Sequence, residues 1–113
     1  MNKVVLMGRL TREPDCFETK GDEPVLVTRY TLAVTRRRKP DKADFINCVC
    51  FGKLADIADQ YFKKGMRVCV SGHLQTGSYE KDGTTVYTTD VIVEEQEFAQ
   101  SKAEEKTTKR TRR

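Results

Sequence analysis

The sequence predicts an all-β domain with one helix, in the order three strands, a helix and two strands. Several runs alternate apolar with polar residues and are bounded by Gly, Pro, Asn or Asp, which is typical of strands. One segment instead repeats its apolar residues at helical spacing. Because 113 residues can bury one hydrophobic core but not two, we expect a single domain.

The first three strands are separated by turn-forming segments. Residues 3–10, "KVVLMGRL", form the first strand and end before the turn-prone "TREPD". Residues 24–35 form a long second strand after the turn "TKGDEP". The loop "RRRKPDK" then leads into a third strand over residues 44–52. In this strand one face carries Ile46, Cys48 and Cys50, and the other carries Phe45, Asn47, Val49 and Phe51.

The helix and the last two strands follow. In residues 53–65, Leu54, Ile57, Ala58 and Tyr61 have helical spacing, and Gly65 suits the position just past the helix end. Residues 66–79 and 86–96 form two strands. The segment between them, "EKDGTT", contains the Asp-Gly pair favoured in tight hairpins.

This order is that of the OB-fold, a five-stranded Greek-key barrel with a helix between strands 3 and 4 that binds oligonucleotides or oligosaccharides. We place this domain at residues 1–98. A generic α+β domain is the alternative reading of the same element order.

Charge is unevenly distributed along the chain. The net charge is +4, but residues 1–98 contain 15 Lys and Arg against 15 Asp and Glu. The last fifteen residues carry six cations and two acids, and their low hydrophobicity predicts a disordered basic tail over residues 99–113. Any attraction of the folded part for a polyanion must therefore come from local clusters of charge.

Few residues could support chemistry. His73 stands alone in a strand, and no Ser-centred elbow, phosphate-binding glycine loop or HExxH motif is present, so we expect no enzyme and no cofactor. Cys48, Cys50 and Cys69 with His73 are candidate zinc ligands, but their spacing fits no usual structural site, and buried reduced thiols are favoured.

No run approaches the about 20 apolar residues of a membrane span. We expect a cytoplasmic protein whose N-terminus is a strand rather than a signal peptide.

The remaining features indicate a single-stranded nucleic acid partner, which such proteins hold with cations for phosphates and aromatic rings for bases. The aromatic candidates are Phe45, Phe51 and Tyr79, with Tyr87 across the last hairpin. The cationic candidates are Arg36, Arg37, Arg38, Lys39, Lys53 and Lys64. The charge run is equally consistent with a solvated loop, Phe51 with a core position, and Tyr79 with cross-strand packing.

Taken together, "NKVVLMGRLTREPD", "LAVT", "FINCVCFGKLADIADQYFKKGMRVCVSGHLQT", "SYEKDG" and "YTTDVIV" closely resemble the bacterial single-stranded DNA-binding proteins. The resemblance implies an OB-fold, usually homotetrameric, around which single-stranded DNA wraps during replication, recombination and repair, in the cytoplasm at the nucleoid. It assigns base stacking to Phe45, where the family commonly has tryptophan, and to Phe51 and Tyr79. It also assigns phosphate contacts to Lys53 and Lys64, and places the loop of residues 36–39 among the DNA contacts.

Two features depart from the family pattern. The chain contains no tryptophan, so stacking depends on Phe and Tyr. Its last residues, "KTTKRTRR", are opposite in charge to the acidic, hydrophobic-tipped tail through which family members recruit replication proteins, which puts such recruitment in doubt. The alternatives are a paralogue for DNA uptake or a mobile element, a primosome-accessory OB-fold dimer, a protein-docking OB module and a nuclease on an OB-like barrel.

Overall fold

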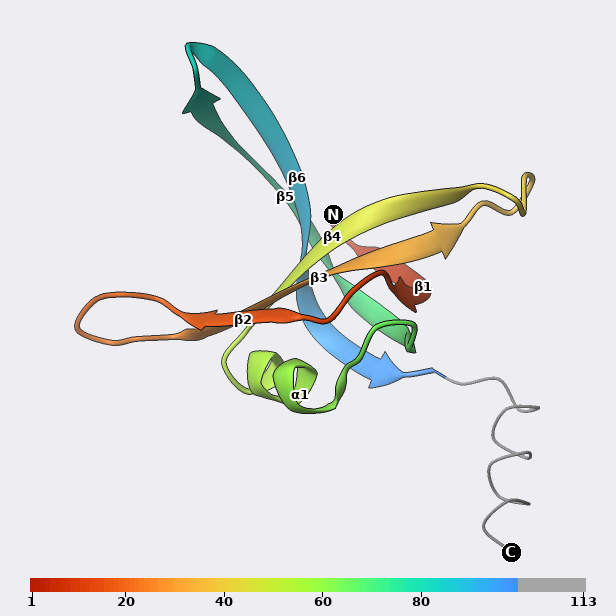
Figure 1. Ribbon diagram of the computed structural model, residues 1–113, viewed down its shortest axis with the longest axis horizontal. Coiled ribbons are helices and arrows are strands. Elements are labelled where there is room, and N and C mark those ends of the chain that lie inside the picture. Colours follow the sequence, from red (N-terminus) through yellow and green to blue (C-terminus); the bar gives the residue numbers. More distant parts are fainter. Residues whose placement is uncertain (100–113) are drawn as a thin grey trace, which may run out of the picture.

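A computed structural model describes residues 1–99 of the chain (Figure 1). The elements within this range are β1 (Val4–Leu10), β2 (Asp15–Glu18), β3 (Leu26–Thr35), β4 (Ala43–Phe51), α1 (Lys53–Tyr61), β5 (Arg67–Lys81) and β6 (Thr84–Phe98). The predicted tail, residues 99–113, lies outside the described residues except for Ala99, whose backbone N–H donates to the carbonyl of Arg67 (2.8 Å).

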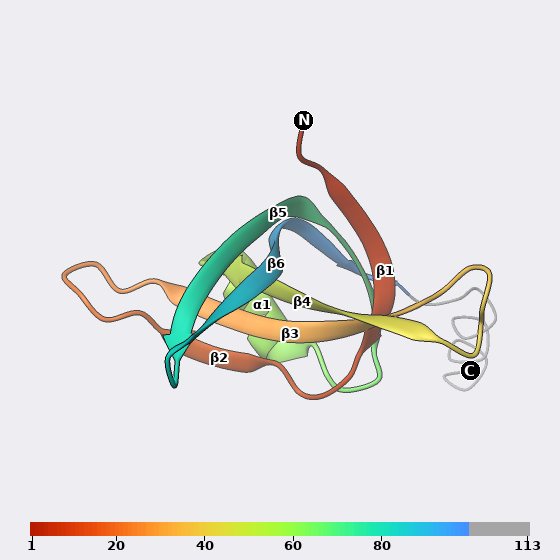
Figure 2. The ribbon, with the colours of Figure 1, turned by 90° about the horizontal axis from the view of Figure 1, so that it is seen from above.

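Five of these strands close into a ring. The strand order is β1-β5-β6-β4-β3-β2, and an additional pairing of β1 with β3 joins the two sides of the sheet. Figure 2 gives a view through this ring of strands, with α1 lying across one of its ends. The ring is uneven, because β4 and β6 pair in parallel at only two positions and β1 and β3 also pair at two. This arrangement confirms the predicted OB-fold, with β2 added beside β3 as a sixth strand.

The core contains the side chains that alternate inward along the barrel strands. Leu32, Val68, Val70, Val91 and Cys48 are almost completely buried. Helix α1 closes the barrel with two small residues at its inner surface, Ala55 and Ala58, which are both fully buried.

Hydrogen bonds fix α1 to the barrel. The Thr28 hydroxyl donates to the carbonyl of Ala55 (2.7 Å). The Tyr30 hydroxyl donates to Gln96 Oε1 (2.8 Å), and the Gln96 amide donates to the carbonyl of Leu54 (2.8 Å). Strands β3 and β6 and the helix are thus connected through polar groups that are all paired, which avoids the cost of burying them alone.

Two elements differ from the sequence prediction. Strand β2 was not predicted, because a strand of four residues with a charged residue at each end has no readable alternation. The helix ends at Tyr61 rather than near Gly65, since Phe62 turns to an extended backbone (φ −84°, ψ 137°) and places its ring in the core. Gly65 instead lies in the turn before β5 with φ of 86°.

The last hairpin is longer than predicted. From Gly72 and Val93 outward, β5 and β6 pair without a further register shift to Lys81 and Thr84, so the turn consists of Asp82 and Gly83 alone. Both have positive φ, 51° and 80°, as the favoured two-residue hairpin turn requires. The hairpin projects from the barrel as an arm, and the β3–β4 hairpin forms a second projection (Figure 1).

Candidate nucleic-acid interface

The outer face of β4 carries two exposed aromatic rings. Phe45 is 68% exposed and Phe51 is 45% exposed, while Cys48 and Cys50 between them are buried. The alternation of a strand explains this division, because odd-numbered residues of β4 point away from the core. Val49 is on the same outer face but is only 4% exposed. The two rings therefore stand at the two ends of one strand face.

The neighbouring strands extend this face on both sides. In β3, Ala33 pairs with Phe45, Thr31 with Asn47, Arg29 with Val49 and Val27 with Phe51, and directly paired residues point to the same side. On the other side, Val49 pairs with Ile92 of β6, which pairs with His73 of β5. We call this surface of β2, β3, β4, β6 and β5 the outer face.

The arm places its two tyrosines on opposite sides. Tyr79 pairs with Val86 and Tyr87 pairs with Ser78, so the two rings lie on different faces of the hairpin. Tyr79 is six residues from His73 along β5 and therefore belongs to the outer face, as Phe45 and Phe51 do. Tyr87 stands across the hairpin on β6, but the pairing register is offset by one residue, so the two rings do not share a face.

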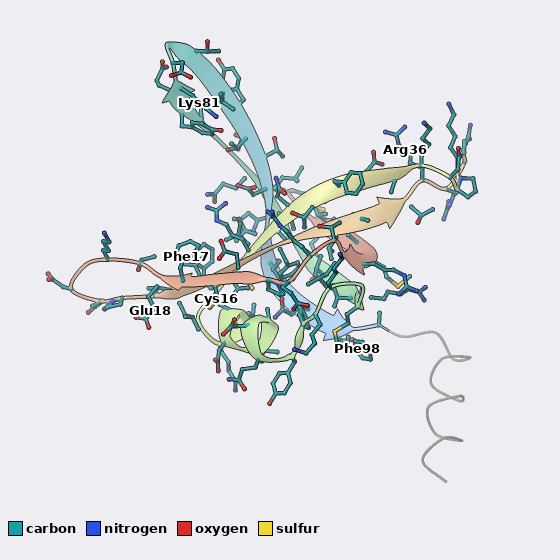
Figure 3. The ribbon with its side chains drawn as sticks, in the orientation of Figure 1. Cys16, Phe17, Glu18, Arg36, Lys81 and Phe98 are labelled. Carbon is teal, nitrogen blue, oxygen red and sulfur yellow. The ribbon has the colours of Figure 1, made fainter. Side chains whose placement is uncertain are left out.

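The cations of the β3–β4 loop are not equivalent. Arg36 is held by Asp44, whose Oδ1 accepts from Nε (3.0 Å) and Nη2 (2.8 Å), and this partner raises the pKa of Arg36. Its charge is therefore locally balanced. Arg37, Arg38 and Lys39 are exposed at the tip of the hairpin (Figure 3, where Arg36 is labelled). These three side chains are the available cations of the run.

The two predicted lysines outside this loop lie apart from each other. Lys53 begins α1, two residues after Phe51, whereas Lys64 follows the helix. The nine-residue helix between them is about 14 Å long by the usual rise per residue. Lys64 instead borders a surface pocket of about 320 Å³ with Arg9, Lys63, Arg67 and Phe98. The structure thus groups Lys53, but not Lys64, with Phe51.

Sequence reasoning missed a polar pocket on the outer face. A hollow of about 220 Å³ lies between β3, the part of β4 between Phe45 and Phe51, and the segment that leads into β2. The polar side chains that line it are Arg12, Asp15, Arg29, Thr31 and Asn47. Arg12 and Asp15 could not be connected with Asn47 from the sequence, because that connection depends on the pairing of β2 with β3.

The residues weighed as a zinc set do not converge. Cys48 and Cys50 are in the core, where burial raises the pKa of each thiol to about 12. Cys69 pairs with Met7, whose side chain is exposed, and so points outward. Within residues 1–99, no group of three or more His, Cys, Asp or Glu side chains is placed to hold a metal ion.

His73 has a partner that the sequence did not indicate. Its Nδ1 lies 2.9 Å from Glu94 Oε2, and Lys3 Nζ is 3.8 Å from the other carboxylate oxygen. The hydrogen bond from His73 is the main cause that lowers the pKa of Glu94, with Lys3 adding to it. Glu94 is 21 residues away along the chain, so only the pairing of β5 with β6 brings the two together.

Comparison with known proteins identifies the family. A family model described as "Single-strand binding protein family" matches residues 1–99. The chain belongs to this family. A single-stranded DNA-binding protein of Clostridium perfringens is 52% identical over 102 residues, covering 89% of this chain and 67% of that protein. Single-stranded DNA-binding protein 2 of Streptococcus agalactiae serotype V is 42% identical over 107 residues, covering 91% and 80%.

A third relative, the single-stranded DNA-binding protein of Fusobacterium nucleatum, is 41% identical over 114 residues, covering 96% of this chain and 73% of that protein. Family membership confirms the resemblance stated from the sequence motifs. Members of the single-strand binding protein family are structural DNA-binding proteins rather than enzymes, as the absence of catalytic motifs predicted. Over residues 1–99, no helix is long and apolar enough to cross a membrane.

Proposed function

We propose that this chain binds and protects single-stranded DNA with little dependence on base sequence, without chemistry on the DNA. The observation that carries the proposal is the common outer face of Phe45, Phe51 and Tyr79, on a barrel of the single-strand binding protein family. Exposed rings offer stacking surfaces to any base, since every base has an aromatic face. Relatives named as single-stranded DNA-binding proteins support the same partner.

The phosphates are contacted by the exposed cations near these rings. Arg37, Arg38 and Lys39 lie at the end of the hairpin that carries Phe45, and Lys53 follows Phe51. Arg36 contributes less to binding because Asp44 occupies its guanidinium. A bound DNA strand reaches Lys64 by continuing around the barrel to the turn between α1 and β5.

The biological setting follows from the family. Single-strand binding proteins act in DNA replication, recombination and repair and form oligomers, and we propose a homotetramer in the bacterial cytoplasm, associated with the nucleoid. The DNA-binding domain is residues 1–98, and the cations of residues 99–113 add electrostatic contacts.

The test of this function is the variant Phe51→Ala. Loss of one stacking ring costs about 1–3 kcal/mol per base, so we expect binding to weaken by about 5- to 150-fold. The loss should be equal for thymidine, cytidine and mixed oligonucleotides, measured by fluorescence anisotropy at fixed salt. A loss confined to one base sequence, or an unchanged affinity, contradicts the stacking role.

A further inference from the structure

Strand β2 brings a fourth aromatic ring to the outer face. Phe17 pairs with Val27 of β3, which in turn pairs with Phe51 of β4, so the three side chains form a row across three strands. Phe17 is 41% exposed and Phe51 is 45% exposed, but Val27 between them is only 3% exposed. A valine on an outer face is buried to this extent only if neighbouring side chains cover it. The two exposed rings therefore stand on either side of a covered apolar residue.

Phe17 is directed away from the core. Its strand neighbour Cys16 pairs with Thr28, which pairs with the buried Cys50, so Cys16 is on the core side and Phe17 is on the other. Figure 3 shows the same division, with Cys16 on the α1 side of β2 and Phe17 on the side from which the β5–β6 arm projects. The arm carries Tyr79, so Phe17 and Tyr79 face the same region of solvent.

Unpaired cations lie directly beside this row. Asp15, Arg29 and Val49 form the next outward-facing row of the same strands, and Arg12 and Arg29 line the pocket of about 220 Å³. Within the part of the chain that the structure describes, neither guanidinium forms a hydrogen bond or an ion pair. They are therefore available to a phosphate, in contrast to Arg36.

The pocket also offers groups suited to the edge of a base. Asn47 Oδ1 accepts from the Thr31 hydroxyl (3.0 Å), which leaves the Asn47 amide N–H groups as donors. The Asp15 carboxylate is an acceptor for the N–H groups that every base carries on its edge. An acidic group at this position repels a phosphate placed against it, so the phosphate is expected at the arginines and the base edge at Asp15.

We propose that Phe17, with Arg12 and Arg29, forms a further nucleotide-binding subsite that extends the single-stranded path from Phe51 across β3 to β2. One base stacks on Phe17 and its phosphate contacts the arginines. This inference depends on the proposed single-stranded DNA binding. It adds residues of β2 and of the segment before it, which the sequence motifs did not single out.

The absence of tryptophan makes a direct test possible. The variant Phe17→Trp keeps an aromatic ring and introduces the sole tryptophan of the chain as a reporter at the subsite. We expect its emission to change on addition of a thymidine oligonucleotide. The matched control is Tyr61→Trp, because Tyr61 is 63% exposed but lies on α1, away from the outer face. Its emission should stay constant.

The variant Phe17→Ala supplies the affinity measurement. Loss of the ring should weaken binding of a long oligonucleotide by about 5- to 30-fold, with Tyr61→Ala unchanged. Thermal unfolding and size-exclusion chromatography establish that fold and assembly are retained.

The outcomes separate the subsite from the proposed function. If the wild-type protein binds single-stranded DNA but Phe17→Trp emission and Phe17→Ala affinity do not change, the subsite is refuted and the proposed function stands. If Phe17→Ala alters the oligomeric state, the ring belongs to an interface between copies, which also overturns the subsite. Failure of wild type to bind single strands refutes the proposed function itself.

Discussion

The two tyrosines of the β5–β6 arm provide a matched pair of perturbations. Both are exposed, Tyr79 at 53% and Tyr87 at 81%, and both stand on one hairpin within a few residues of its turn. Only Tyr79 shares the outer face with Phe45 and Phe51. The variants Tyr79→Ala and Tyr87→Ala remove the same side chain from opposite sides of one structural element, so effects on the arm itself should be similar.

The expected loss of DNA affinity differs between the two variants, because a base bound on the outer face can stack on Tyr79 but not on Tyr87. Stacking on one ring contributes about 1–3 kcal/mol, and the half-exposed Tyr79 suggests the lower part of this range, about 1–2 kcal/mol, or about 5- to 30-fold in affinity. Tyr87→Ala should change affinity by less than about twofold. The assay is anisotropy of a labelled thymidine oligonucleotide at fixed salt. An equal loss in both variants, or a larger loss in Tyr87→Ala, refutes the assignment of faces from the pairing register.

Three further predictions concern stability and the tail. Tyr30→Phe removes the donor to Gln96 in a part-buried hydrogen bond and should lower the free energy of unfolding by about 1–3 kcal/mol; an unchanged urea midpoint contradicts the structural role of this bond. Because burial raises the pKa of the Cys48 and Cys50 thiols from 9.0 to about 12, the neutral form is favoured in the folded state. Stability should be intact below pH 9 and fall as the pH rises towards 12, and a Cys48→Ala, Cys50→Ala variant should show a smaller decrease in this window. Deleting residues 100–113 should flatten the dependence of log affinity on log salt by about 0.7 for each phosphate that the tail neutralises, without a change in the unfolding midpoint; an unchanged slope means that the tail does not touch the DNA.

The fold was predictable from local patterns because most of its strands are long and alternate strongly. The β4 segment showed its two faces in the sequence, and Asp82 with Gly83 marked the two-residue turn between β5 and β6. The missed strand, β2, has four residues and depends on pairing with β3 for its existence. The helix end was misplaced because tertiary packing of Phe62 in the core overrides the helical spacing of the sequence.

The candidate site was predictable where it depends on alternation within an individual β-strand. Phe45 and Phe51 follow from the alternation in β4, but contacts between distant segments do not follow from spacing. The sequence could not show that Asp44 occupies Arg36, or that Tyr87 faces away from Tyr79, since both depend on register. Likewise Phe17 acquires a role only when β2 is placed two strands away from Phe51.

One measurement tests the central claim most directly. A fluorescently labelled thymidine oligonucleotide is titrated with the protein at low and moderate salt, with and without excess unlabelled duplex, and anisotropy is recorded. A label is required because the chain contains no tryptophan. The outer face of aromatic rings and cations predicts tight, salt-sensitive binding that duplex DNA does not displace, because paired bases cannot stack on the rings. Weak binding, or binding that duplex competes away equally, contradicts the proposal that this face holds single strands.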